Sequence, residues 1–242
     1  MRFLSFRAWL RALRHPRRSA TRIASARDVL YARAELSYAQ HGEDRVLAGL
    51  LDWAPPGFYV DVGAHHPIRL SNTASLYRAG WCGIDVDASP GTVRLFHHYR
   101  PRDVALEVGV GAVPGSLPFY VFDDEAVNTF SAEWARDAVA NKHKLMRTID
   151  VPIVTLAEIL SRNLPHGQEI DLLSVDVEGL DLEVLRSNDW DRYRPGLVMV
   201  EDLGIESLSR AADSRIVQFL NGNGYDPIAK TTTTLFFKRV DR

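Results

Sequence analysis

A strand that ends in a glycine turn constrains the fold of this chain more than any other stretch. Residues 58–62 are bulky or β-branched apolar residues apart from Asp61, and Gly63 follows them directly. This pattern predicts a buried strand that runs into a tight loop. In an open parallel sheet, ligands bind just beyond the carboxyl ends of the strands, where a glycine lets the backbone approach a cofactor closely. The sequence therefore predicts a pocket at Gly63.

Strand and helix patterns alternate along the chain, and its 46% hydrophobic residues suffice for one sizeable core. We expect strands that begin at residues 58 and 170, strands at 82–87, 104–110, 117–122, 149–154 and 196–202, helices at 45–51, 74–78, 92–99, 155–160, 180–187 and 210–221, and a closing antiparallel pair at 225–230 and 234–239. Such alternation predicts an α/β fold: a doubly wound, mostly parallel sheet whose C-terminal antiparallel hairpin forms one edge.

The charge of the chain is divided unevenly. Residues 1–36 carry nine arginines and two acids, a net charge of +7, so residues 37–242 carry −9. Arginines interrupt every apolar run of the first segment, which excludes a signal-peptide core and a membrane span there. We interpret residues 1–36 as a basic extension, a candidate amphipathic helix for a membrane surface or a partner enzyme, and 37–242 as one domain. The alternative is a frayed extension, or a start codon assigned too far upstream.

The acidic body and the single cysteine limit the environment and the partners. A net negative domain argues against broad nucleic-acid binding, because that binding relies on neutralising phosphates. Cys82 alone can form neither an intrachain disulfide framework nor a multi-cysteine zinc site, which suits a reducing compartment. We therefore expect a cytoplasmic protein, with the inner face of the membrane as a candidate contact of the basic extension.

Acidic residues follow several of the predicted parallel strands. They are Asp61, Asp87, Asp176, Glu178, Glu201 and Asp202. Because parallel strands point their carboxyl ends one way, we expect these acids along one edge, where they repel a pyrophosphate and attract a cationic nucleoside. Asp87 lies 24 residues after Gly63, close to the spacing of a ribose-binding acid in a βαβ unit. The loop after Gly63 also lacks the further glycines of a pyrophosphate site, and S-adenosylmethionine, a sulfonium without phosphate, fits both observations.

Several short motifs occur in order along roughly residues 37–202. They are QHGED at 40–44, YVDVGAHHP at 59–67, SNT at 71–73, LY at 76–77, GW at 80–81, NTF at 128–130, DVEG at 176–179 and DW at 189–190. Together they resemble the motifs of FkbM-type methyltransferases. The resemblance implies a class I S-adenosylmethionine-dependent methyltransferase fold and O-methylation of a hydroxyl, commonly on a sugar, glycan or polyketide. One departure is DASP at 87–90, where relatives often carry EPNP, so the carboxylate of Asp87 has a shorter reach.

The resemblance also implies which residues bind the cofactor. Asp61, Gly63 and His65 would frame its methionine end, and Asp87 would hold its ribose. The full set that it implies is Gln40, Asp61, Gly63, Ala64, His65, Asn72, Asp87, Ala88 and Ser89.

Methyl transfer to a hydroxyl also requires that the hydroxyl lose its proton, and a general base contributes about 10²–10⁴-fold to such a step. Asp176 is the first candidate, either as the base or as the ligand of a metal that acidifies the hydroxyl, and Glu178 and His66 follow. Asp176, Glu201 and Asp202 form a candidate oxygen-ligand set for magnesium. For Glu201 and Asp202 the alternative is helix capping or simple solvation, which leaves metal dependence open.

Residues 123–147 break the alternation of strands and helices and form a candidate cap over the acceptor, the alternative being an ordinary surface insertion. The expected partner is a hydroxyl-bearing small molecule or glycan. Two other functions compete with methyl transfer. One is a catalytically degenerate cofactor-binding partner of a glycan-assembly enzyme. The other is a nicotinamide-dependent sugar oxidoreductase, although its fingerprint glycines and Tyr-x-x-x-Lys pair are not found.

Overall fold

The computed structural model describes residues 36–51, 56–205 and 207–240 of the 242-residue chain. The chain divides into two units, Met1–Ser37 and Tyr38–Arg242, and the described sheets belong to the second. The predicted basic extension therefore lies outside the described residues, apart from Leu36. Within the described part of the chain, every helix is too short or too polar to span a bilayer.

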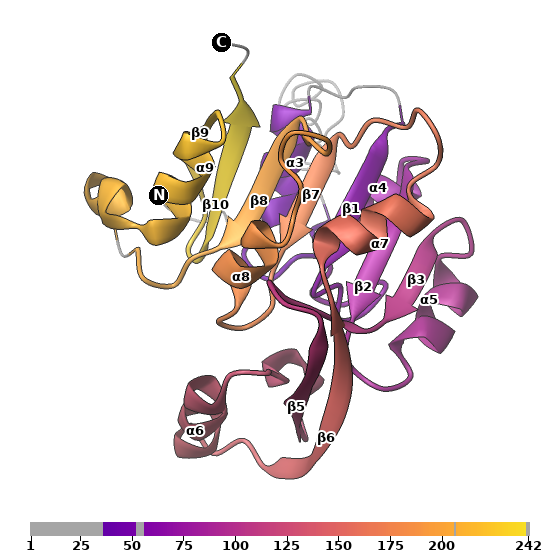
Figure 1. Ribbon diagram of the computed structural model, residues 1–242, viewed down its shortest axis with the longest axis vertical. Helices are drawn as coiled ribbons and strands as arrows, with labels where there is room; N and C mark the ends of the chain where they lie inside the picture. The colour runs from indigo at the N-terminus through magenta and orange to yellow at the C-terminus, as the bar shows by residue number, and fades with distance from the viewer. Residues whose placement is uncertain (1–35, 52–55, 206, 241–242) are drawn as a thin grey trace, which may run out of the picture. The chain divides into compact units, whose positions relative to one another are not determined.

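A seven-stranded sheet forms the centre of the second unit (Figure 1). In sheet order its strands are β3 (Val104–Glu107), β2 (Cys82–Asp87), β1 (Phe58–Val62), β7 (Leu172–Val175), β8 (Leu197–Glu201), β10 (Thr234–Arg239) and β9 (Tyr225–Lys230). The first five are parallel, and β10 is antiparallel to both of its neighbours. The predicted α/β sheet with a C-terminal hairpin is confirmed, but the reversed strand lies one place in from the edge, between β8 and β9.

Helices cover both faces of this sheet (Figure 1). They are α3 (Glu43–Leu50), α4 (Ala74–Arg78), α5 (Thr92–Tyr99), α7 (Leu156–Asn163), α8 (Asp181–Arg186) and α9 (Arg215–Gly222), with the 3-10 helix η2 (Leu208–Asp213) before α9. On β1, Val60 packs into the larger core with α7, α8 and α9, whereas Tyr59 packs into the smaller one with α3 and α4. Because successive side chains of a strand point to opposite faces, Asp61 shares the face of Tyr59.

The chain leaves the main sheet after β3 and forms a second sheet. Its strands, in the order β4-β6-β5, are β4 (Gly109–Val110), β6 (Leu145–Val154) and β5 (Gly115–Phe122), and the 3-10 helix η1 (Glu125–Val127) and the helix α6 (Ala132–Ala140) lie between β5 and β6. Figure 1 shows β5, β6 and α6 projecting beyond the carboxyl ends of the parallel strands of the main sheet. The predicted excursion at 123–147 is therefore part of a folded layer that faces the predicted site.

Two predicted elements are divided in the structure. The strand predicted at 104–110 is wrong as a single element, because β3 pairs with β2 whereas Gly109 pairs with Ile153 of β6. The helix predicted at 210–221 is interrupted at Ser214, whose hydroxyl accepts hydrogen bonds from the backbone N–H groups of Ile216 and Val217. This side chain caps the start of α9. Because an N-cap residue has non-helical backbone angles, the preceding helix η2 ends before Ser214.

A buried arginine joins the elements beneath the β1–α4 loop. Arg100 follows α5, is 1% exposed, and donates hydrogen bonds to Asp103 at 2.7 Å, Asp85 at 2.9 Å and the hydroxyl of Tyr59 at 2.6 Å. It also donates to the hydroxyl of Thr73, just ahead of α4, at 3.0 Å. A buried charge is tolerated only where it is paired and hydrogen-bonded, and here one guanidinium connects β1, β2, α4 and α5.

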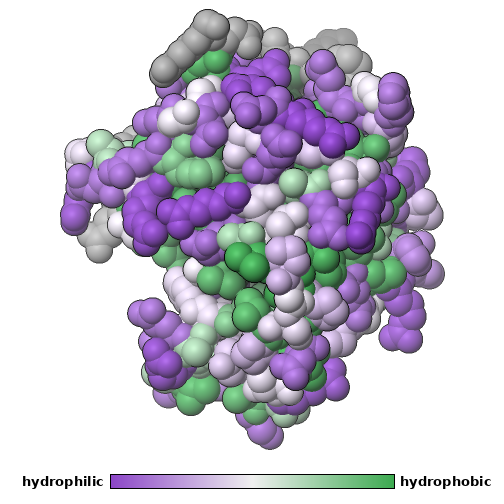
Figure 2. Space-filling view, in the orientation of Figure 1, coloured by the Kyte–Doolittle hydropathy of each residue, from purple (hydrophilic) through white to green (hydrophobic). Residues whose placement is uncertain are grey.

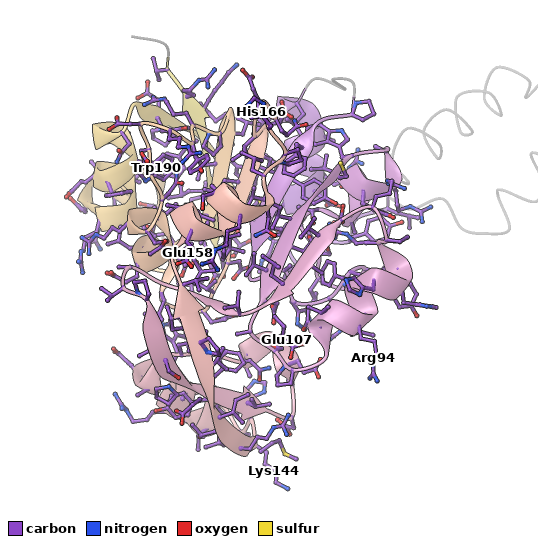
Figure 3. The ribbon with its side chains drawn as sticks, turned by 45° about the vertical axis from the view of Figure 1, so that its right-hand side comes forward. Arg94, Glu107, Lys144, Glu158, His166 and Trp190 are labelled. Carbon is purple, nitrogen blue, oxygen red and sulfur yellow. The ribbon has the colours of Figure 1, made fainter. Side chains whose placement is uncertain are left out.

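Replacement of Arg100 by methionine should destabilise the protein by about 3–5 kcal/mol, because Asp85 and Asp103 would be left buried without their cation. Urea unfolding gives the change in the free energy of unfolding. Arg94→Met is the matched control, since Arg94 lies on α5 and its side chain projects toward solvent (Figure 3). A similar small loss in both variants would contradict the role assigned to Arg100.

Candidate active site

A groove lies at the carboxyl ends of β1, β2 and β7, against the second sheet. Of the predicted cofactor-binding residues, those that line it are Gln40, Gly63, His65, Asp87, Ala88 and Ser89. Its volume is about 780 Å³ when the space open to solvent is included. A ligand of nucleoside size would therefore lie in an open groove rather than in a closed cavity.

Gly63 forms the floor of this groove. Its φ of 83° lies in the left-handed region, and a Cβ atom at this position would collide with the backbone carbonyl of Asp176. The backbone N–H of Gly63 donates to the carbonyl of Val86 at 2.8 Å, which holds the β1 loop against the end of β2. Only glycine combines this conformation with this close approach of two strand ends.

Asp87 lies at the end of β2 and faces the groove. One of its carboxylate oxygens accepts from the backbone N–H of His65 at 2.8 Å, and the other from the backbone N–H of Ser89 at 2.6 Å. These bonds fix the carboxylate between two loops, and each oxygen retains a second lone pair for a hydroxyl of a ligand. The side chain is thus positioned before any ligand binds.

Three predicted cofactor-binding residues and one predicted base lie elsewhere in the described chain. Asp61 is 2% exposed and accepts a hydrogen bond from the hydroxyl of Thr73 at 2.6 Å, on the sheet face that holds Arg100. Ala64 is buried, and Asn72 lies in the turn before α4; neither they nor Asp61 are among the residues that line the groove. Burial raises the pKa of the Asp61 carboxyl, which fits a role inside the fold.

His66, the predicted base of the β1 loop, is not among the described residues that line the groove. Its Nδ1 atom accepts hydrogen bonds from the backbone N–H groups of Ile68 and Arg69, both at 3.0 Å. Burial lowers the pKa of the imidazole, which keeps Nδ1 available as an acceptor. In this arrangement His66 shapes the loop after Gly63.

The second sheet supplies a wall that the candidate residues from the sequence did not include. Asn128 donates to the hydroxyl of Ser89 at 3.0 Å and accepts from the backbone N–H of Phe122 at 2.8 Å, so it joins the β2 loop to β5. Phe119 and Phe130 line the same wall with their ring centroids 4.5 Å apart. The NTF motif at 128–130, the strand predicted at 117–122 and the candidate cap at 123–147 were the sequence signals for this wall.

Three carboxylates meet where the groove passes the ends of β7 and β8. Asp176, Glu178 and Glu201 each place an oxygen within 4.8 Å of the others. Burial, together with the neighbouring carboxylates, raises the pKa of Glu178 to about 7, that of Glu201 to about 8 and that of Asp176 well above its usual range. We call these three residues the carboxylate cluster, and at neutral pH it holds protons that other surface acids have lost.

Asp202, in contrast, does not join the carboxylate cluster. Its carboxylate accepts from the hydroxyl of Ser214 at 2.5 Å and from the backbone N–H of Gly204 at 3.1 Å. The predicted magnesium set of Asp176, Glu201 and Asp202 is thus not brought together as a set, because Asp202 turns toward the start of α9. The three oxygens that the structure does gather could take a hard cation or share protons.

The turn at Glu178 and Gly179 holds the cluster in place. Glu178 has a φ of 54° and Gly179 one of 101°, and the indole of Trp134 on α6 lies so close to Gly179 that a Cβ atom there would collide with it. The hydroxyl of Thr129 donates to the carbonyl of Glu178 at 2.9 Å. A non-glycine residue with positive φ persists only where its surroundings fix it, and here the second sheet and α6 do so.

Residues 61–227 match the model of the methyltransferase FkbM domain. The comparison with curated proteins gave no match. Among solved structures, a TehB-like SAM-dependent methyltransferase from Corynebacterium glutamicum is 12% identical, with 93% of this chain and 100% of that chain covered and a TM-score of 0.39. Precorrin 8W decarboxylase from Methanobacterium thermoautotrophicum is 15% identical, with 81% and 89% covered and a TM-score of 0.39.

Glu178→Gln should stabilise the protein at pH 8 and flatten its pH dependence of stability. The folded-state pKa of about 7 lies above the usual value of 4.5, so the folded state binds more protons across this interval and loses stability as the pH rises through it. Thermal unfolding at pH 5 and pH 8 measures the effect, expected as several degrees at pH 8. Glu169→Gln, in an exposed loop, is the control; an equal response of both variants would refute the raised pKa.

Proposed function

Because the chain belongs to the FkbM methyltransferase family, we propose that it transfers a methyl group from S-adenosylmethionine to a hydroxyl of a sugar, glycan or polyketide-type molecule. The family supports S-adenosylmethionine-dependent methyl transfer in general, and the sheet is that of the class I methyltransferase fold. The observation that carries the finer proposal is the carboxylate cluster, which lies at the end of the groove and combines raised pKa values with access to a bound ligand.

The residues of the groove fit S-adenosylmethionine. Asp87 is held where it can accept hydrogen bonds from ribose hydroxyls, and Val108, Val110 and Phe119 offer an apolar wall to a purine. Asp176 lines the same groove and favours a cation, because carboxylates attract positive charge more strongly where water is partly excluded. A phosphate-bearing cofactor would meet repulsion at this end.

Proton transfer is the step for which the cluster is suited. When bound, S-adenosylmethionine supplies a methyl group on a sulfonium and leaves as the neutral thioether. In that step the acceptor hydroxyl would give up its proton to a carboxylate of the cluster as its oxygen takes the methyl group from the sulfonium. Orientation of the two reactants can supply about 7–11 kcal/mol of the barrier, and the base adds about 10²–10⁴-fold.

Glu178 is the member of the cluster that we propose as the base. Its pKa of about 7 matches neutral pH, and its side chain lines the groove. A nearby cation lowers carboxyl pKa values, so a bound sulfonium would favour the ionised form that accepts the proton. Asp176, the first candidate from the sequence, shares the cluster and its proton, and magnesium on the same three oxygens is the alternative way to acidify the hydroxyl.

The acceptor that we propose is a neutral or weakly charged hydroxyl compound rather than nucleic acid, because the body of the chain is acidic. A location in the cytoplasm, with the basic extension against a membrane or a partner enzyme, remains part of the proposal. The rival function as a binding partner without activity would keep the groove but has no use for a cluster with raised pKa values.

Glu178→Gln should lower kcat by about 10²–10⁴-fold and remove the rise near pH 7 of the kcat/KM–pH profile, which reports the free enzyme, because the amide cannot take up the proton. The assay follows transfer of a labelled methyl group from S-adenosylmethionine to a panel of glycans and hydroxylated polyketides, with and without a chelator. Glu169→Gln serves as the control of equal charge change.

Binding of the cofactor without transfer to any acceptor would favour the inactive partner, and absence of binding would favour the oxidoreductase. Loss of transfer with chelator, restored by magnesium, would assign the cluster to a metal. Full turnover by Glu178→Gln would exclude Glu178 as the base.

A further inference from the structure

A second cavity opens beside the groove. It has a volume of about 440 Å³ and lies between Trp134 of α6, the turn at Gly179, and the segment from Arg210 to Ile216. We propose that this cavity binds a neutral carbohydrate ring as the methyl acceptor, with the indole of Trp134 as its platform. This inference rests on the proposed function, since it names the acceptor of that reaction and the place where it binds.

The position of the cavity relative to the carboxylate cluster is the first argument. Glu201 lines the cavity, Asp176 and Glu178 line the groove, and oxygens of all three lie within 4.8 Å of one another. The two spaces therefore meet at the cluster. A hydroxyl of a molecule in the cavity would meet the same carboxylates as the positively charged end of a molecule in the groove.

The size and accessibility of the cavity suit a small organic molecule. Its volume of about 440 Å³ falls within the range of roughly 300–1,000 Å³ that is typical of ligand sites. Figure 2 shows the surface hollowed at the left, between the part built on the main sheet and the part that contains α6. A ligand can enter here without passing through the groove.

The polar groups of the cavity select among the acceptors named for the reaction. Its wall carries four carboxylates and two guanidinium groups, from Asp181, Glu201, Asp202, Asp213, Arg210 and Arg215. Asp181 is buried and accepts from two backbone N–H groups, Asp202 accepts from Ser214 and Gly204, and Arg210 pairs with Asp213, so a ligand would meet mainly Glu201, Arg215 and the exposed Arg210–Asp213 pair. A largely apolar polyketide would strip water from these groups without replacing its hydrogen bonds, which is costly. Carboxylates accept from hydroxyls and guanidinium groups donate to them, so a polyol satisfies both kinds. The excess of carboxylates disfavours an acidic sugar.

Among the described residues that line the cavity, Trp134 is the one that offers an aromatic face. Its indole packs on the backbone of Gly179, next to Glu178 of the cluster, and is half-buried, so one part is fixed and another is open to the cavity. An aromatic ring provides a flat apolar surface at little cost in side-chain entropy, and the C–H face of a pyranose is its natural complement. Contact with Trp134 would bring a ring hydroxyl toward the cluster.

Saturation-transfer NMR with irradiation of aromatic protons tests this proposal on the full chain in the presence of S-adenosylhomocysteine. The probes are methyl α-D-glucopyranoside, methyl α-D-mannopyranoside and methyl α-L-rhamnopyranoside, with methyl α-D-glucuronide as the acidic probe and erythronolide B as the apolar one.

We expect signals from at least one neutral glycoside in the wild-type protein. Its affinity should fall about tenfold or more in Trp134→Leu and should be retained in Trp134→Phe. Affinity for S-adenosylhomocysteine, measured by calorimetry, should stay within about twofold in Trp134→Phe, because a ring still packs on Gly179 beside Glu178. In Trp134→Leu the loss of glycoside affinity should exceed any loss of S-adenosylhomocysteine affinity, and equal losses would overturn the inference.

Each outcome bears on the cavity separately from the reaction. Binding of a neutral glycoside that Trp134→Leu abolishes supports the cavity even if no methyl group is transferred, in which case the proposed function alone fails. Methyl transfer to a glycoside whose affinity is equal in wild type and Trp134→Leu overturns the inference while the proposed function stands. Preference for the glucuronide or the macrolactone, or no signal from any neutral glycoside, also overturns it.

Discussion

The crowding of three carboxylates at the ends of β7 and β8 is the constraint on which the account of this protein depends. Oxygens of Asp176, Glu178 and Glu201 lie within 4.8 Å of one another and are partly removed from water. Such an arrangement is unfavourable when all three are ionised, and it is relieved by protons or by a cation. In the unliganded protein burial, together with repulsion from neighbouring carboxylates, raises the pKa of Glu178 to about 7 and that of Glu201 to about 8. A positively charged methyl donor would relieve it in the complex.

Two separate supports hold this cluster at the sheet edge. From within, Arg100 ties the face of β1 and β2 to α4 and α5, and Thr73 extends that network to Asp61, two residues before Gly63. From outside, Trp134 and Thr129 fix the turn that carries Glu178. The groove and the cavity both border the cluster, so the same elements that hold the carboxylates also shape the place where the two binding spaces meet.

Much of the fold and the acidic edge could be predicted because they follow from local patterns. Strand and helix periods located the main sheet, and parallel strands placed Asp87, Asp176 and Glu201 at one edge regardless of the details of packing. Asp61 lies on the same face of the sheet as Tyr59, away from the groove, because side chains alternate along β1. Asp202 points toward α9 because it accepts a hydrogen bond from Ser214, which caps that helix. Trp134 had no local signal, since its contact with Gly179 arises only when the second sheet folds over the first.

The number of protons released when a cationic ligand binds tests the central claim most directly. Calorimetric titration at pH 7 in buffers of different ionisation enthalpy gives this number for S-adenosylmethionine and, as a reference without the sulfonium charge, for S-adenosylhomocysteine. If the cluster holds protons that a cation displaces, the sulfonium ligand should release a substantial fraction of one proton more than the thioether, and Glu178→Gln should reduce the difference. Equal proton release by the two ligands would contradict the account.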